Sequence, residues 1–237
     1  MTTAPLAGDP GRAAAVRDMF TRIAPAYDRA NVWISLGIAG WWRGAALREL
    51  GDQAGGEVLD LCAGTLDFSV ALAGRSRRVV AVDFCPSMLE LGRDKLPAGA
   101  AVELVCADAR ELPLADGSVD AAIAGFGVRN VPEPERALAE VHRVLRPGGR
   151  FVVLDFFAPR SPVARLLDRT YNRSVLPLVG GFLSGERSAY RYLAESMGAW
   201  VDRPGFERLC TAAGFVGVRG RDLVPPVAGL VVAERAR

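Results

Sequence analysis

The sequence predicts an α/β fold: a doubly wound, mostly parallel sheet of seven strands. Short apolar runs alternate with segments of helical periodicity through the first two thirds of the chain, which is typical of parallel strands joined by helices. The run at 57–61 enters a turn of small residues that opens a helix. The last two apolar runs are joined by a link too short for a parallel crossover, so we expect them to pair antiparallel.

The expected elements follow in chain order. A helix is predicted near 13–24, because Val16, Met19, Phe20 and Ile23 recur at helical spacing before Pro25. Five strands that are apolar on both faces are then predicted at 58–61, 79–83, 102–106, 119–124 and 151–156. The helix before the fifth strand should stop at 147–149, a Pro-Gly-Gly sequence. A helix near 204–213 and strands at 215–222 and 228–234 complete the chain.

Length and composition indicate one domain, 1–237. The opening helix suggests a helical cap at 11–50, and the end of the strand–helix alternation after the fifth strand suggests a helical insertion at 159–203 on the substrate side. Half of the residues are hydrophobic, enough for a large core. The balance of 29 basic and 27 acidic residues gives no basic face for nucleic acid, so a small molecule is the expected partner. The cysteines form no C-x-x-C pair and no run is long enough to span a bilayer, so we expect a cytoplasmic protein without a metal.

Small and acidic residues at the predicted strand ends indicate a nucleotide-like cofactor. Ala63, Gly64 and Thr65 are small enough for backbone N–H groups to approach an anion at a helix start. Acids are expected at three strand ends, Asp60, Asp83 and Asp108, where Asp83 can accept both hydroxyls of a ribose. Asp108 with Ala109 suits an adenine edge, and Gly125 leaves room for the backbone after the fourth strand.

The identity of that cofactor follows from the glycine pattern. A dinucleotide fingerprint reads G-x-G-x-x-G, whereas residues 62–67 contain a single glycine. We therefore expect S-adenosylmethionine, with the carboxylate of its methionine part at the first turn.

Longer motifs in the chain resemble a known family, the menaquinone and ubiquinone biosynthesis C-methyltransferases. The most specific are 126–131, Phe-Gly-Val-Arg-Asn-Val, and 190–196, Tyr-Arg-Tyr-Leu-Ala-Glu-Ser. The resemblance implies a class I S-adenosylmethionine-dependent methyltransferase that acts on the ring of a prenylated quinol, converting demethylmenaquinol to menaquinol. The implied cofactor-binding set is Tyr27, Ala63, Gly64, Thr65, Asp83, Phe84, Met88, Asp108, Ala109 and Gly125, the last replacing a serine usual in the family.

One position departs from the family pattern. The first loop of the family normally reads Gly-Thr-Gly-Asp, and this chain has leucine at position 66 in place of the second glycine. If the position requires a positive φ, leucine is strained there by about 1–2 kcal/mol. The loop would then be reshaped, the cofactor shifted or its affinity lowered.

Candidate catalytic residues follow the fourth strand. Arg129 and Asn130 are expected beside the reacting ring, where a cation or hydrogen-bond donor stabilises negative charge on a phenolic oxygen. The alternative is that Arg129 pairs with a helix carboxylate such as Glu133. Tyr190 and Tyr192 are expected to contact substrate, although residues two apart on a helix face different directions.

Two other functions are compatible with these residues: methylation of another small aromatic or polyketide-like phenol, and binding without transfer. A lipid quinol as substrate also implies peripheral contact with the inner face of the membrane. The sequence leaves the oligomeric state open.

Overall fold

The computed structural model describes residues 16–24, 28, 37–159, 192, 196, 200–224 and 228–237. Tyr27 and Tyr190, and most of the insertion expected at 159–203, lie outside these residues. The strands are β1 (Glu57–Leu61), β2 (Arg78–Asp83), β3 (Val102–Cys106), β4 (Val119–Gly125), β5 (Leu145–Asp155), β6 (Val216–Asp222) and β7 (Gly229–Glu234).

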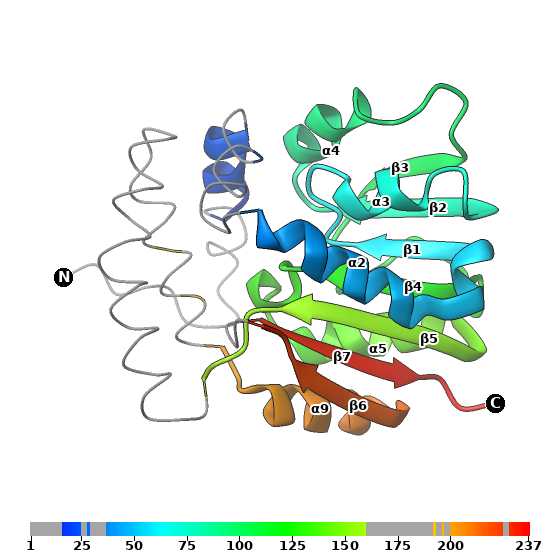
Figure 1. Cartoon of the computed structure of the whole chain (residues 1–237), viewed down its shortest axis with the longest axis vertical. Helices are drawn as coiled ribbons and strands as arrows, with labels where there is room; N and C mark the ends of the chain where they lie inside the picture. The colour runs from blue at the N-terminus through cyan, green and yellow to red at the C-terminus, as the bar shows by residue number, and fades with distance from the viewer. Residues whose placement is uncertain are drawn as a thin grey trace.

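These strands form one sheet in the order β3-β2-β1-β4-β5-β7-β6 (Figure 1). Strands β1 to β5 pair in parallel, and β7 pairs antiparallel with both β5 and β6. The predicted fold class, a mostly parallel sheet with an antiparallel terminal hairpin, is confirmed.

The start of β5 differs from the prediction. The strand begins at Leu145 rather than at 151, so the Pro-Gly-Gly sequence expected to follow the helix lies inside its first part. The pairing with β4 jumps from Val119 opposite Leu145 to Ala121 opposite Arg150, and Gly148 supplies a positive φ of 79° within that irregularity. A bulge of this kind cannot be recognised from alternation of apolar residues.

Helices cover both faces of the sheet. Residues 16–24 are helical, and the other described helices are α2 (Ile38–Leu50), η1 (Gly51–Gly55), α3 (Asp67–Leu72), α4 (Pro86–Arg93), η2 (Val128–Asn130), α5 (Pro134–Val144) and α9 (Arg203–Ala212). Val58 faces α2 and α3, whereas Leu59 and Leu61 face α5 and α9. Successive side chains of a strand point to opposite faces, which is why the strands are apolar throughout.

The chain passes from β1 outward to β2 and β3, and then returns to place β4 on the other side of β1. In open α/β sheets ligands bind at such a point, beyond the carboxyl ends of the strands. The helix over residues 16–24 lies at this end of the sheet (Figure 1). None of the helices in the described part of the chain has the length and apolar character required for a bilayer span.

Candidate active site

A cleft of about 750 Å³, including its part open to solvent, lies at the carboxyl ends of β1, β2, β3 and β4. Most lining residues end or follow a strand, and Val16 and Phe20 come from the N-terminal helix. The predicted residues among them are Gly64, Asp83, Phe84, Met88, Asp108, Ala109, Gly125 and Asn130.

Cys62 lines the cleft and was not predicted there; its position directly after β1 was the available signal. Phe126 and Gly127, which follow Gly125 at the end of β4 and were expected to leave room for the backbone there, also line it. A Cβ on Gly127 would lie 2.3 Å from the Cβ of Cys62, so glycine is needed where these two segments meet.

Asp83 is the buried acid of the cleft, with 7% of its surface exposed. One carboxylate oxygen accepts the Gly64 amide and the other accepts the Cys85 amide, each at 2.9 Å. Burial raises the pKa of Asp83, against the opposing effect of these amides. Each oxygen retains acceptor capacity toward the cleft, which fits the prediction that this residue accepts ribose hydroxyls.

Two of the three amides of the predicted anion site, those of Ala63 and Gly64, already have partners within the protein. The Ala63 amide donates to the Val82 carbonyl at 3.0 Å, and the Gly64 amide donates to Asp83. The chain after β1 thus remains hydrogen-bonded to the end of β2, and both donors are used. Ala63 and Thr65 are also not among the residues that line the cleft.

Asp60 is not part of the cleft, contrary to the expectation of three acids at strand ends. It lies one residue before the end of β1 on the face covered by α3, where the Ser69 amide and hydroxyl donate to the same carboxylate oxygen at 2.9 and 2.6 Å. Asp60 therefore anchors α3 to the sheet. Desolvation raises its pKa to about 7.

Leu66 has the positive φ that would strain a leucine, 67°. Its side chain is fully buried with Ala63, Ala81 and Leu89, and it does not line the cleft. Gly92 in α4 makes room, because a Cβ there would lie 2.4 Å from Leu66 Cγ. The loop keeps a left-handed turn and directs the isobutyl group into the core, away from the cofactor cleft.

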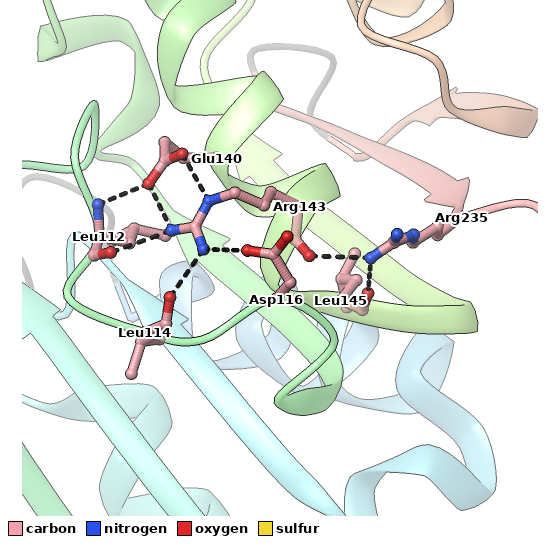
Figure 2. A network of polar contacts seen from close by, with 7 residues as sticks. All are labelled: Leu112, Leu114, Asp116, Glu140, Arg143, Leu145 and Arg235. Carbon is pink, nitrogen blue, oxygen red and sulfur yellow. Dashed lines mark hydrogen bonds and ion pairs between the residues drawn. The ribbon is translucent and has the colours of Figure 1, made fainter.

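Asp108 lines the cleft beside Arg110. Hydrogen bonds from the Arg110 side chain lower the pKa of the Asp108 carboxyl. The irregular segment 107–118 that carries Asp108 is held by Arg143 of α5. Figure 2 shows the Arg143 guanidinium reaching the Leu112 carbonyl, the Leu114 carbonyl and Asp116, at 3.0, 2.7 and 2.7 Å.

Arg129 lies in η2 with only 4% of its side chain exposed. Its guanidinium donates to Asp155 at 2.6 Å and lies over the Phe156 ring, 5.4 Å from the centroid. The alternative pairing with Glu133 is wrong, since Glu133 pairs with Arg110 and Arg136. The expected contact of Arg129 with substrate stays a prediction.

Asn130, the other catalytic candidate, lines the cleft. The Tyr192 hydroxyl donates to its side-chain oxygen at 3.4 Å. A residue of the predicted substrate-side insertion is thereby joined to the wall of the cleft.

This strand order, with a buried acid at the end of β2 and a cleft at the switch point, defines a class I S-adenosylmethionine-dependent methyltransferase. The sequence model of the ubiE/COQ5 methyltransferase family matches residues 10–234, and the chain belongs to that family. The predicted family, the methyltransferase activity and its S-adenosylmethionine cofactor are confirmed.

Relatives resemble the chain over nearly its whole length. It is 43% identical to a protein named demethylmenaquinone methyltransferase from Clavibacter sepedonicus, over 99% of this chain and 94% of the relative. A protein of the same name from Thermus thermophilus is 42% identical over 92% of this chain and 100% of the relative. A ubiquinone/menaquinone biosynthesis C-methyltransferase from Syntrophotalea carbinolica is 44% identical over 87% and 88%.

Solved structures share the fold at lower identity. A putative methyltransferase in complex with the Haloferax volcanii Trm112 activator is 16% identical, with a TM-score of 0.68 over 92% of this chain and 98% of the other. Haemonchus contortus phosphoethanolamine N-methyltransferase 2, solved with S-adenosylhomocysteine, is 13% identical, with a TM-score of 0.66 over 88% of this chain and 56% of the other.

Proposed function

We propose that the protein methylates a ring carbon of a prenylated quinol, converting demethylmenaquinol to menaquinol. The names of the relatives from Clavibacter sepedonicus and Thermus thermophilus support this acceptor. The structural observation that carries the proposal is a single cleft containing both a buried carboxylate, Asp83, and an amide, Asn130, that is bonded to Tyr192.

The described residues fit the cofactor. Asp83 offers a carboxylate for ribose hydroxyls, and Phe84, Met88 and Val131 supply apolar surface for an adenine ring. Asp108 and Ala109 line the same cleft as candidates for the polar edge of the base. When bound, S-adenosylmethionine supplies an electrophilic methyl group on its sulfonium.

Around the acceptor, the residues of this chain would position the ring and stabilise charge. The Asn130 amide and the Tyr192 hydroxyl can hydrogen-bond a quinol oxygen as its proton leaves to water. The Asp155 carboxylate accepts hydrogen bonds from the Arg129 guanidinium, at 2.6 Å, and from the Arg129 backbone amide, at 3.3 Å. That pairing fixes η2, and with it Asn130. Arg129 remains protonated, so it acts through charge and orientation rather than as a base.

The proposal is tested by transfer of an isotope-labelled methyl group from S-adenosylmethionine to chemically reduced demethylmenaquinol. Mass spectrometry of the extracted lipid should find one added methyl on a ring carbon. Folded protein that binds S-adenosylhomocysteine but gives no product with this acceptor would contradict it.

Acceptor structure separates the alternatives. A quinol methyltransferase should prefer an acceptor with a prenyl tail to the same ring without one, whereas an enzyme for small phenols should not. A binding protein of this fold would retain the cofactor and methylate neither compound.

A prenylated acceptor resides in a bilayer, so we also propose that the protein contacts the membrane surface peripherally. The supporting observation is a pair of exposed apolar side chains, Trp41 at 54% and Val224 at 74%. Their segments adjoin, because the Trp42 indole donates to the Val224 carbonyl at 3.1 Å. Co-sedimentation with vesicles of anionic phospholipid should fall for Trp41→Ser relative to the parent.

A further inference from the structure

Lys95 stands just beyond the end of α4 and outside the residues that line the cleft. Its ammonium donates to the Thr65 carbonyl at 2.9 Å and forms an ion pair with Asp28. Asp67, at the start of α3, lies 3.6 Å away. One oxygen of Asp28 and two oxygens from residues 65–67 therefore surround the ammonium, with the Asp67 oxygen at ion-pair distance.

The Asp28 carboxylate joins the same group through its other oxygen, which accepts the Thr65 hydroxyl at 2.6 Å. Thr65 is thus bound twice, by Asp28 through its hydroxyl and by Lys95 through its carbonyl. It lies between Gly64, which lines the cleft, and Leu66 with its left-handed backbone. Holding Thr65 consequently holds the turn that presents Gly64 to the cofactor.

The C-terminal end of α4 packs closely against the same turn. A Cβ on Gly92 would approach the Thr65 carbonyl carbon to 2.7 Å, and the Lys95 amide closes the helix on the Gly92 carbonyl at 3.0 Å. The close approach of the α4 backbone at Gly92 to the Thr65 backbone therefore places Lys95 beside Thr65. The other end of α4 carries Met88, which lines the cleft.

The type of residue is informative, because Lys95 is the only lysine among 29 basic residues. A guanidinium is planar and presents its donors as a fork, whereas an ammonium directs three protons around one point. The oxygens of Asp28 and Thr65 that converge on this point, with Asp67 at ion-pair distance, suit the ammonium. The one lysine in an arginine-rich chain thus occurs where oxygens from two parts of the chain converge on a single point.

We propose that Lys95 is a positioning residue for the cofactor: it links Asp28 of the N-terminal segment to the Thr65 turn, so that cofactor affinity depends on this link. The inference rests on the proposed function, because it takes cofactor binding as its effect. Val16 and Phe20, which precede Asp28 in the chain, also line the cleft.

The test uses the full chain and S-adenosylhomocysteine as the probe, with dissociation constants from calorimetry. We expect Lys95→Met and Asp28→Asn each to weaken binding about tenfold. The double variant should bind about as well as the weaker-binding single variant, because both substitutions remove the same link. The KM for S-adenosylmethionine should rise about as much, with kcat changed less than about threefold. Lys95→Arg should recover less than half of the loss.

Arg93→Met is the matched control, since Arg93 is two residues away and pairs only with Glu90 on the outer side of α4 among the described residues. It should bind like the parent. Binding by Lys95→Met within twofold of the parent, multiplicative effects in the double variant, or full recovery by Lys95→Arg would overturn the inference. A parent protein that does not bind the probe would instead overturn the proposed function.

Discussion

Leu66 is a residue whose backbone and side chain act in opposite directions on stability. Its left-handed conformation costs about 1–2 kcal/mol relative to glycine. Its isobutyl group is fully buried against Ala81 and Leu89, and removal of a buried leucine side chain costs about 2–5 kcal/mol. The burial outweighs the strain, which explains how leucine is tolerated in this turn.

Truncation of Leu66 separates the two effects. We expect Leu66→Gly to be less stable than the parent by about 1–3 kcal/mol, because the lost packing exceeds the strain relieved. Leu66→Ala should be less stable still, since it loses most of the packing and keeps the strained φ. Urea unfolding measures both. An alanine variant as stable as the glycine variant would show that the turn carries no strain.

Gly125 is required by the ring of Phe68, because a Cβ there would lie 2.5 Å from Phe68 Cε2. We expect Gly125→Ser, which introduces the serine usual in the family, to lower stability by about 1–3 kcal/mol through overpacking. Adding Phe68→Leu should return part of the loss. Gly40→Ala is the control, as a Cβ at Gly40 has no atom within 4 Å. Equal unfolding midpoints for Gly125→Ser and the parent would contradict this account.

At the scale of elements, Arg143 joins α5 to the segment between β3 and β4 (Figure 2). Glu140 orients it and accepts the Leu112 amide at 2.7 Å, and hydrogen bonds from Arg143 lower the pKa of Glu140. Arg235 donates to the Arg143 carbonyl at 2.8 Å, which ties the end of α5 to the C-terminal segment. This network holds the segment that carries Asp108 and Ala109 to the cleft.

Arg143→Met should leave the Leu112 and Leu114 carbonyls without this donor and destabilise the protein by about 1–3 kcal/mol. Hydrogen exchange should accelerate at the Leu112 amide more than in β1. Arg136→Met is the control on the same helix, because its side chain is 60% exposed and pairs with Glu133. Unchanged exchange at Leu112 would rule out the role of Arg143 in holding the segment.

Most elements were predictable because their signals are local. The periods of apolar residues placed β1 to β4 within one or two residues of their observed bounds. The early start of β5 was missed, since it depends on pairing with Val119 of β4 rather than on its own sequence. The cleft was predictable in outline, as eight predicted residues line it, but the partners of Thr65, Arg129 and Asp60 were not.

For the whole molecule, the buried Asp60 makes stability depend on pH. Its pKa is raised from 3.8 to about 7 in the folded protein, so the folded state binds more protons than the unfolded state between these values. The stability associated with Asp60 is therefore fully present below the lower value and is lost as the pH rises through the higher one. The slope for one such group is at most about 1.4 kcal/mol per pH unit.

Asp60→Asn should remove this contribution, because an amide oxygen can accept both donors of Ser69 without a charge. The free energy of unfolding of the variant minus that of the parent should increase as pH rises from 4 to 7, and this difference should level off above that range. Urea unfolding at several pH values measures it, with Asp52→Asn at an exposed position as control. A difference independent of pH would contradict the buried, protonated carboxyl.

The sequence by itself determined the fold class, the strand that begins the cofactor site and the edge of the sheet where the cleft lies. These follow from short-range periodicity and from the rule that parallel strands end at one edge. Only the tertiary structure decided which side chains meet. Asp60 reaches Ser69, Leu66 reaches Gly92 and Lys95 reaches Asp28 through contacts between different elements. Such contacts depend on how the packed elements are oriented relative to one another, and local sequence patterns do not encode that orientation.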